Sequence, residues 1–257
     1  MYVKLSDRFD LILFAGQSNM AGRGCVEDAA VCPPGVAWEY RAVTDPDHLH
    51  PLIEPFGQHE NIPGLIDDGG KKTGSMVSAF VAEYHRLTGR SVVGVSASKG
   101  GTSSQEWRDG LVQDAATRLE QATAWLKAHG MTPQHTLALW CQGETDGDYA
   151  VPAEEYRRNF EAIWLRLRSA GASCCGLIQI GHFNRTMYPE DLRDEQYDVI
   201  RKEQLRIAGE LPEVFLAGSF APYEQQMKDA FHYCQRAYND VGMEAAQKAA
   251  DYLRNKR

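Results

Sequence analysis

Three residues that together can cleave an ester lie near opposite ends of the chain, Ser18 at one end and Asp229 and His232 at the other. A serine hydroxyl attacks a carbonyl carbon when a neighbouring base removes its proton, and that base is most often a histidine oriented by a carboxylate. Asp229 and His232 are three residues apart, so the carboxylate can reach the imidazole from the same turn of chain. These residue types fit acyl transfer.

Donors for the negative charge of that reaction are also present. Attack on a carbonyl creates an oxyanion, which needs two or three preorganised hydrogen-bond donors. Glycine-rich turns at Gly100-Gly101 and Gln142-Gly143 offer backbone N–H groups and one side-chain amide. Each turn follows a predicted strand, as Ser18 does.

Ser18 itself has other interpretations. Five apolar residues, 11–15, end in a glycine and small polar residues, which indicates a buried strand running into a tight turn. A serine at such a junction can cap the following helix instead of acting as a nucleophile. The glycine spacing over 16–24 also allows a phosphate-binding turn, although it fits neither G-x-G-x-x-G nor the P-loop pattern.

Short apolar runs alternate with amphipathic helices along the chain. Strands are predicted over 11–15, 91–97, 136–141, 174–180 and 214–217, and helices over 76–87, 111–128, 152–169, 192–209 and 239–256. Parallel strands need crossover connections of this length, so the pattern predicts a five-stranded parallel sheet covered on both faces. Without a repeat or linker, 1–257 is expected to form a single domain. The polar residues after the strands should then meet at one edge of the sheet.

The region 25–72 breaks the pattern. It contains six prolines and shows no sustained periodicity, so helices and strands are not expected there. A long loop of this kind is often functional and is expected to shape a substrate cleft. His48, His50 and His59 lie in it and are interpreted as solvent-exposed side chains rather than metal ligands.

Composition excludes several classes of protein. The 257 residues carry a formal net charge of -8, which argues against a dedicated nucleic-acid binder. No apolar run approaches the roughly 20 residues of a membrane span. Residues 1–10 lack the apolar core of a signal peptide, so the chain as given is expected to be cytoplasmic, or secreted with its signal removed. The six cysteines lack CxxC spacing and are expected to be free, a Cys25–Cys32 bridge being the alternative.

Several further side chains have two interpretations. Glu144 and Asp146 could form the acid/base pair of a glycosidase, but they lie two residues apart on one loop, which favours bracing of that loop. His182 follows a strand and either lines the pocket or lies on the surface. Trp107 and Tyr233 either stack on a sugar ring or pack the loops around them. Cys141 ends an apolar strand and is expected to be buried rather than reactive.

Four blocks together resemble a known family: Gly16-Gln17-Ser18-Asn19-Met20, Gly100-Gly101-Thr102 with Trp107, Gln142-Gly143-Glu144-Thr145-Asp146, and Asp229-Ala230-Phe231-His232. They resemble the SGNH/GDSL hydrolase superfamily, and within it the sialate O-acetylesterase-like branch that includes the acetylxylan esterases of carbohydrate esterase family six. The resemblance extends from residue 13 to residue 242. It implies a flavodoxin-like three-layer α/β/α fold with five parallel strands.

The resemblance also implies roles for particular residues. Ser18 would be the nucleophile, His232 the general base and later acid, and Asp229 the group that orients His232. The oxyanion donors would be the backbone N–H of Ser18, that of Gly100 (with Gly101 as the alternative) and the Gln142 amide. Supporting or substrate-lining roles are expected for Gln17, Gly101, Thr102, Glu144 and His182.

The implied reaction removes O-acetyl groups from sugars through an acetyl-enzyme, without a metal or organic cofactor. Its expected partner is an acetylated carbohydrate, with no nucleic acid or membrane involved and no prediction of oligomeric state. A sialate O-acetylesterase and a non-catalytic carbohydrate-binding module on the same scaffold are the alternatives. The presence of serine, histidine and aspartate counts against the second.

Overall fold

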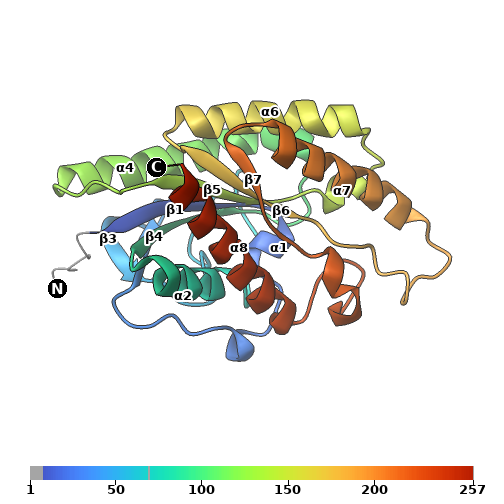
Figure 1. Ribbon diagram of the computed structural model, residues 1–257, viewed down its shortest axis with the longest axis horizontal. Coiled ribbons are helices and arrows are strands. Elements are labelled where there is room, and N and C mark those ends of the chain that lie inside the picture. Colours follow the sequence, from blue (N-terminus) through green and yellow to red (C-terminus); the bar gives the residue numbers. More distant parts are fainter. Residues whose placement is uncertain (1–7, 69, 257) are drawn as a thin grey trace.

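A single mostly parallel sheet organises the computed structural model, which describes residues 8–68 and 70–256 (Figure 1). Its seven strands run in the order β3-β2-β4-β1-β5-β6-β7. Every neighbouring pair is parallel except β2 and β3, which form an antiparallel hairpin at one edge. The strands are β1 (Phe9–Gly16), β2 (Ala37–Arg41), β3 (Asp45–Pro51), β4 (Ser91–Ser98), β5 (Thr136–Cys141), β6 (Cys174–Gln179) and β7 (Val214–Ser219).

Long helices cover both faces of this sheet. One face carries α2 (Val77–Thr88) and α8 (Gln235–Asn255), and the other carries α4 (Val112–Ala128), α6 (Ala153–Ser169) and α7 (Arg193–Glu210) (Figure 1). Short helical turns connect them: α1 (Ser18–Ala21), η1 (Val26–Asp28), α3 (Ser104–Glu106), η2 (Trp107–Leu111), α5 (Glu144–Asp148) and η3 (Ala221–Gln226). The predicted α/β/α layering is confirmed.

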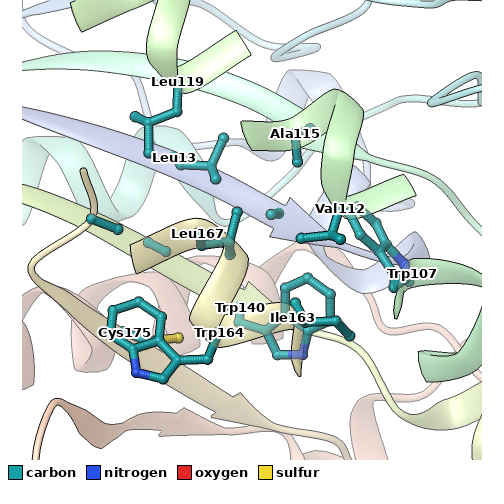
Figure 2. Packing of buried hydrophobic residues seen from close by; sticks show 14 of the residues in the cluster. Leu13, Trp107, Val112, Ala115, Leu119, Trp140, Ile163, Trp164, Leu167 and Cys175 are labelled. Carbon is teal, nitrogen blue, oxygen red and sulfur yellow. The ribbon is translucent and has the colours of Figure 1, made fainter. Parts of the chain in front are cut away.

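The apolar run of β1 supplies side chains to a core on each face of the sheet, so helices can pack on both faces. Successive side chains of a strand point to opposite faces, so Leu11 and Leu13 enter the core beneath α4 and α6, whereas Ile12 and Phe14 enter the core beneath α2 and α8. Figure 2 shows the first of these cores, with Leu13 facing Leu119 of α4 and the α6 side chains nearby. Burial on both faces accounts for the absence of polar alternation in this strand.

The prediction of five strands was wrong, and so was the prediction that 25–72 contains no strand. β2 lies parallel to β4, with Ala37 opposite Val92 and Tyr40 opposite Val95. Proline masked this hairpin in the sequence, because proline removes a donor from a sheet. Pro46 and Pro51 are tolerated in β3 because it is the edge strand and hydrogen-bonds on one side only.

The predicted helices begin and end close to their observed bounds, with one larger difference. Helix α8 starts at Gln235 rather than 239. The Gln235 side chain donates one tertiary hydrogen bond to the carbonyl of Ser75 and one within the helix to Asn239, and both support this additional first turn.

Several of the alternatives left by the sequence are decided by burial. Trp107 and Tyr233 are almost fully buried, so they pack the loops and do not present a ring to a sugar. All six cysteines are free, and Cys141 is buried. His48 and His50 contact the carboxylate of Asp45. Within residues 8–68 and 70–256, no helix combines the length and apolarity of a membrane span; part of the expectation for 1–10 lies outside the described residues.

Candidate active site

Ser18, His232 and Asp229 meet at the carboxyl edge of the sheet. Ser18 is the first residue of α1, directly after β1, and its Oγ lies 3.0 Å from His232 Nε2. The other ring nitrogen, Nδ1, lies 2.9 Å from Asp229 Oδ2. In the neutral tautomer with a proton on Nδ1, the ring donates to Asp229 and accepts from the serine hydroxyl. The structure therefore brings together the three residues predicted to form a triad.

The aspartate is held rigidly by its own loop. Asp229 Oδ1 accepts the backbone N–H groups of Phe231 and His232, each at 2.8 Å. Partial burial of this carboxyl favours its protonated form, but these hydrogen bonds and the His232 ring outweigh burial and lower its pKa. Asp229 is therefore ionised where it faces the imidazole.

The pKa of His232 is lowered, whereas the contact with Asp229 alone would raise it. Burial lowers the pKa of His232 below 6.5, and Asp229 only partly opposes this effect. The positive charges of Arg23 and Lys228 add to the lowering. A neutral imidazole is therefore favoured at neutral pH, as a general base requires.

A polar cavity of about 260 Å³ opens over Ser18 and His232. Its walls combine both signs of charge with two glycines and one aromatic ring. The lining residues are Gln17, Ser18, Arg23, Asp68, Lys71, Gly100, Gly101, Glu144, Thr145, Asp148, Phe231 and His232. Of the residues predicted to support the site, Gln17, Gly101 and Glu144 line this cavity.

The backbone N–H groups near Ser18 are not equivalent. As the first helical residue, Ser18 has an N–H without an intrahelical acceptor. The N–H of Gly100 donates to Asp68 Oδ1 at 2.7 Å, so a carboxylate occupies the donor that the sequence favoured. Gly101 follows with a φ of +69° and lines the same cavity. Of the two glycines, Gly101 is the one whose N–H is not engaged by Asp68.

The structure does not bring the Gln142 amide to the cavity. Gln142 is fully buried, and its Nε2 donates to the carbonyl of Thr102 at 3.0 Å and to Asp146. Both amide protons are thereby used in bracing the loop after β4. The predicted oxyanion role of Gln142 does not fit this geometry, because its donors point into the loop and not toward Ser18.

The two acidic residues of the block after β5 differ in position. Asp146 accepts the backbone N–H and the hydroxyl of Ser104, so it braces the neighbouring loop as expected. Glu144 reaches the cavity, where its Oε1 accepts a hydrogen bond of 2.5 Å from Asn19. Burial raises the pKa of Glu144 to about 7. Its Oε2 has no partner among the described residues.

Two further predicted residues lie away from the cavity. His182 contacts Asp194 through Nδ1 at 3.0 Å, in the loop beyond β6. Thr102 donates to the carbonyl of Lys99 and accepts from the indole of Trp107. Both side chains support loops around the site.

Sequence reasoning missed six of the cavity residues: Arg23, Asp68 and Lys71, which form one group of contacts, and Thr145, Asp148 and Phe231. Arg23 Nη2 donates to Asp68 Oδ2 at 2.7 Å, and Arg23 Nη1 donates to the carbonyls of Gly22 and Lys71. Arg23 lies within the glycine-spaced stretch 16–24, whereas Asp68 and Lys71 come from the proline-rich region that was expected to form a cleft wall. Across the described ranges, no group of three or more His, Cys, Asp or Glu side chains is arranged to hold a metal ion.

The α/β/α fold brings a serine, a histidine and an aspartate into contact at the carboxyl edge of its sheet, which is the arrangement of a serine hydrolase. A protein-family model described as "Carbohydrate esterase, sialic acid-specific acetylesterase" matches residues 8–251. The chain belongs to this family. It is therefore a carboxylic-ester hydrolase, and its family supports acetylesterase activity.

Solved structures share the fold at low sequence identity. A protein from Arabidopsis thaliana is 22% identical, with a TM-score of 0.66 over 96% of this chain and 99% of that one. NanS is 15% identical, with a TM-score of 0.68 over 99% and 100% of the two chains. A carbohydrate acetylesterase from Xanthomonas citri is 16% identical, with a TM-score of 0.59 over 95% of this chain and 57% of that one. No curated protein matches the chain in sequence.

Proposed function

We propose that this protein removes O-acetyl groups from a carbohydrate through an acetyl-enzyme formed on Ser18. The observation that carries the proposal is the position of His232, which lies within hydrogen-bond distance of both Ser18 Oγ and Asp229 at the base of an open polar cavity. The family match adds the carbohydrate ester as the substrate class.

The reaction follows from the contacts. Ser18 Oγ attacks the acetyl carbon while His232 Nε2 takes the hydroxyl proton. The tetrahedral intermediate collapses, the C–O bond to the sugar breaks, and His232 returns the proton to the leaving sugar oxygen. A water molecule then gives a proton to His232 and attacks the acetyl-enzyme. The bond from the acetyl carbon to Ser18 Oγ breaks, His232 returns the proton to Oγ, and acetate leaves.

The space around Ser18 supports a small acyl group. A Cβ placed on Gly100 would lie 2.6 Å from Arg23 Nη2, 3.0 Å from Asp68 Oδ1 and 3.3 Å from Ser18 Cβ. The turn therefore approaches the nucleophile closely, and ionic side chains close the space beside it. A long apolar acyl chain would have to displace those charged groups, whereas an acetyl group would not.

The family description supports a second candidate, an acetylated acidic sugar such as sialic acid. Lys71 lines the cavity as a cation for such a sugar, whereas Arg23 is already paired with Asp68. A neutral acetylated sugar, such as a fragment of acetylxylan, is the alternative that the other walls allow, since Asp68, Glu144 and Asp148 can accept hydrogen bonds from sugar hydroxyls.

Hydrolysis of 4-nitrophenyl acetate and butyrate by the wild type beside Ser18→Ala is the first test. The proposal expects acetate to be cleaved faster than butyrate, with both rates abolished in the variant and Ser18 labelled by a phosphonate. Acetylated sialic acid and acetylated xylose fragments then separate the two substrates by kcat/KM. Absence of hydrolysis of every acetyl ester, together with an unlabelled Ser18, would favour a carbohydrate-binding module.

A further inference from the structure

The environment of Ser18 lacks the third oxyanion donor that the sequence predicted. That donor was expected from the exit of β5, on the side of β1 opposite to the glycine turn after β4. The Gln142 amide does not fill this role, since both of its donors are taken by Thr102 and Asp146. A third donor on the β5 side would therefore have to come from another group.

The side chain of Gln17 extends to this side. Its Oε1 accepts the backbone N–H groups of Gly143 at 3.1 Å and Thr145 at 3.4 Å, both directly after β5. Two backbone donors converge on the same atom, which identifies that atom as the oxygen and the other as the nitrogen of the amide. The exit of β5 therefore fixes both the position and the rotation of the Gln17 amide.

Among the residues that the structure describes, none offers an acceptor to the nitrogen of this amide. Gln17 is 3% exposed and lines the cavity together with Ser18. Its Oε1 makes the two bonds above, and within residues 8–68 and 70–256 its Nε2 makes none. Nε2 is not completely enclosed by protein atoms, so it can be reached from the cavity that Gln17 lines. A buried amide nitrogen that reaches a cavity and lacks an acceptor is a binding group for an oxygen in that cavity.

We propose that Gln17 Nε2 is an oxyanion donor of this enzyme, beside the backbone N–H of Ser18 and acting in place of Gln142. The inference rests on the proposed function and adds Gln17 to the catalytic residues of the proposed deacetylation. As Ser18 Oγ bonds to the acetyl carbon, the carbonyl oxygen gains negative charge and Nε2–H donates to it. The amide keeps its proton, and the donated bond weakens again when the carbonyl re-forms.

Two substitutions of Gln17 separate its proposed donation to the oxyanion from its support of the loop after β5. Gln17→Glu keeps an acceptor for the N–H groups of Gly143 and Thr145 but replaces the donor with an oxygen, and Gln17→Met removes both. Gln142→Met tests the competing donor. Gln113→Met is the matched control, since Gln113 lies on the exposed side of α4 and contacts Thr117 and Arg166.

The readouts are kcat and KM for 4-nitrophenyl acetate, and affinity for a methyl trifluoromethyl ketone, which adds to Ser18 as a tetrahedral oxyanion. Both Gln17 variants should lower kcat by about 10²–10³-fold, with little change in KM. Affinity for the ketone should fall by the same factor, whereas affinity for acetate, a planar ligand, should change little. Gln113→Met should match the wild type.

Several results would overturn the inference. One is a folded Gln17→Glu protein with kcat within about threefold of the wild type, far short of the loss of an oxyanion donor. Another is a loss that appears equally in KM and in acetate binding. A third is a loss of kcat and ketone affinity in Gln142→Met that the Gln17 variants do not show. If Gln17→Met fails to fold, Gln17→Glu decides. A wild type that neither hydrolyses acetyl esters nor binds the ketone would instead refute the proposed function, and this is seen before any variant is made.

Discussion

Asn19 and Glu144 are joined by a hydrogen bond of 2.5 Å from Asn19 Nδ2 to Oε1 of Glu144, a residue that lines the active-site cavity. The same nitrogen donates to the carbonyl of Phe231 at 3.2 Å, and Asn19 Oδ1 accepts from the hydroxyl of Tyr238. One amide thus ties the residue after the nucleophile to the exit of β5 and to the loop that carries His232.

The buried Glu144 carboxyl should make stability depend on pH. Its pKa is about 7 in the folded protein against 4.5 for the ordinary group, because burial disfavours the charge. The folded state therefore holds the proton more tightly, and this contribution to stability is lost as pH rises through about 7. Glu144→Gln removes the titration, so its free energy of unfolding relative to the wild type should rise by roughly 3 kcal/mol between pH 4.5 and 8.

Urea unfolding of both proteins across that pH range measures the effect, with the exposed Glu120→Gln as the control. A free-energy difference between Glu144→Gln and the wild type that stays constant with pH would contradict the prediction.

The acid limb of the rate profile should respond to the groups around His232. Only the neutral ring accepts the serine proton, so kcat/KM should fall as pH drops through a pKa that lies below 6.5. Lys228→Met removes a positive charge near the ring and should move this limb to higher pH, with the plateau retained. Asp229→Asn removes the group that raises this pKa, so the limb should move to lower pH.

The two variants should also differ in the value that kcat/KM reaches above the pKa of His232. For Asp229→Asn this plateau should fall by as much as about 10⁴-fold, since the ring loses the group that orients it. Profiles of kcat/KM measured with one acetyl ester check both directions. Limbs that coincide in all three proteins would show that a group other than His232 controls the rate.

The Arg23–Asp68 pair should matter more as a pair than as separate residues. The two side chains contact each other at 2.7 Å, and Asp68 also accepts the N–H of Gly100 beside Ser18. Arg23→Gln leaves the buried Asp68 carboxylate without its cation, close to where the oxyanion forms, and should lower kcat by about tenfold or more.

Asp68→Asn in the Arg23→Gln background should recover part of this loss, because the isolated charge is removed. A double-mutant cycle on kcat measures the coupling between the two residues. Strictly additive effects would show that the pair does not act as a unit.

Arg118 should contribute strongly to the stability of the fold, because it binds the segment that leads to Asp68. Its guanidinium is buried, pairs with Asp114 at 3.0 Å, and donates to the carbonyls of Glu60 and Ser96. Arg118→Met leaves the Asp114 carboxylate buried without its cation, and should cost about 3–5 kcal/mol of unfolding free energy.

Arg86→Met is the matched control, since Arg86 forms an exposed pair with Glu83 and should cost at most about 1 kcal/mol. Denaturant unfolding of both variants tests the contrast. Equal losses would mean that burial does not distinguish the two ion pairs.

The periodicity of the chain was sufficient to predict most of the fold. The strands β1, β4, β5 and β6 are buried on both faces and β7 is largely buried, which favours continuous apolar sequence and makes such strands easy to recognise. The β2–β3 hairpin was missed because it lies at the sheet edge, where proline and exposed polar residues are allowed. Its pairing with β4 is a long-range contact that no local pattern records.

Residue types by themselves determined which groups could do the chemistry: a serine after a strand, an aspartate and a histidine three apart, and glycines at the strand exits. Only the tertiary structure decided which donors face Ser18. It turned Gln142 toward Thr102 and Asp146, fixed Gln17 by two N–H groups from another strand exit, and placed Asp68 against Gly100. The physical reason is that a polar side chain follows its hydrogen-bond partners, and here those partners come from segments far away in the sequence.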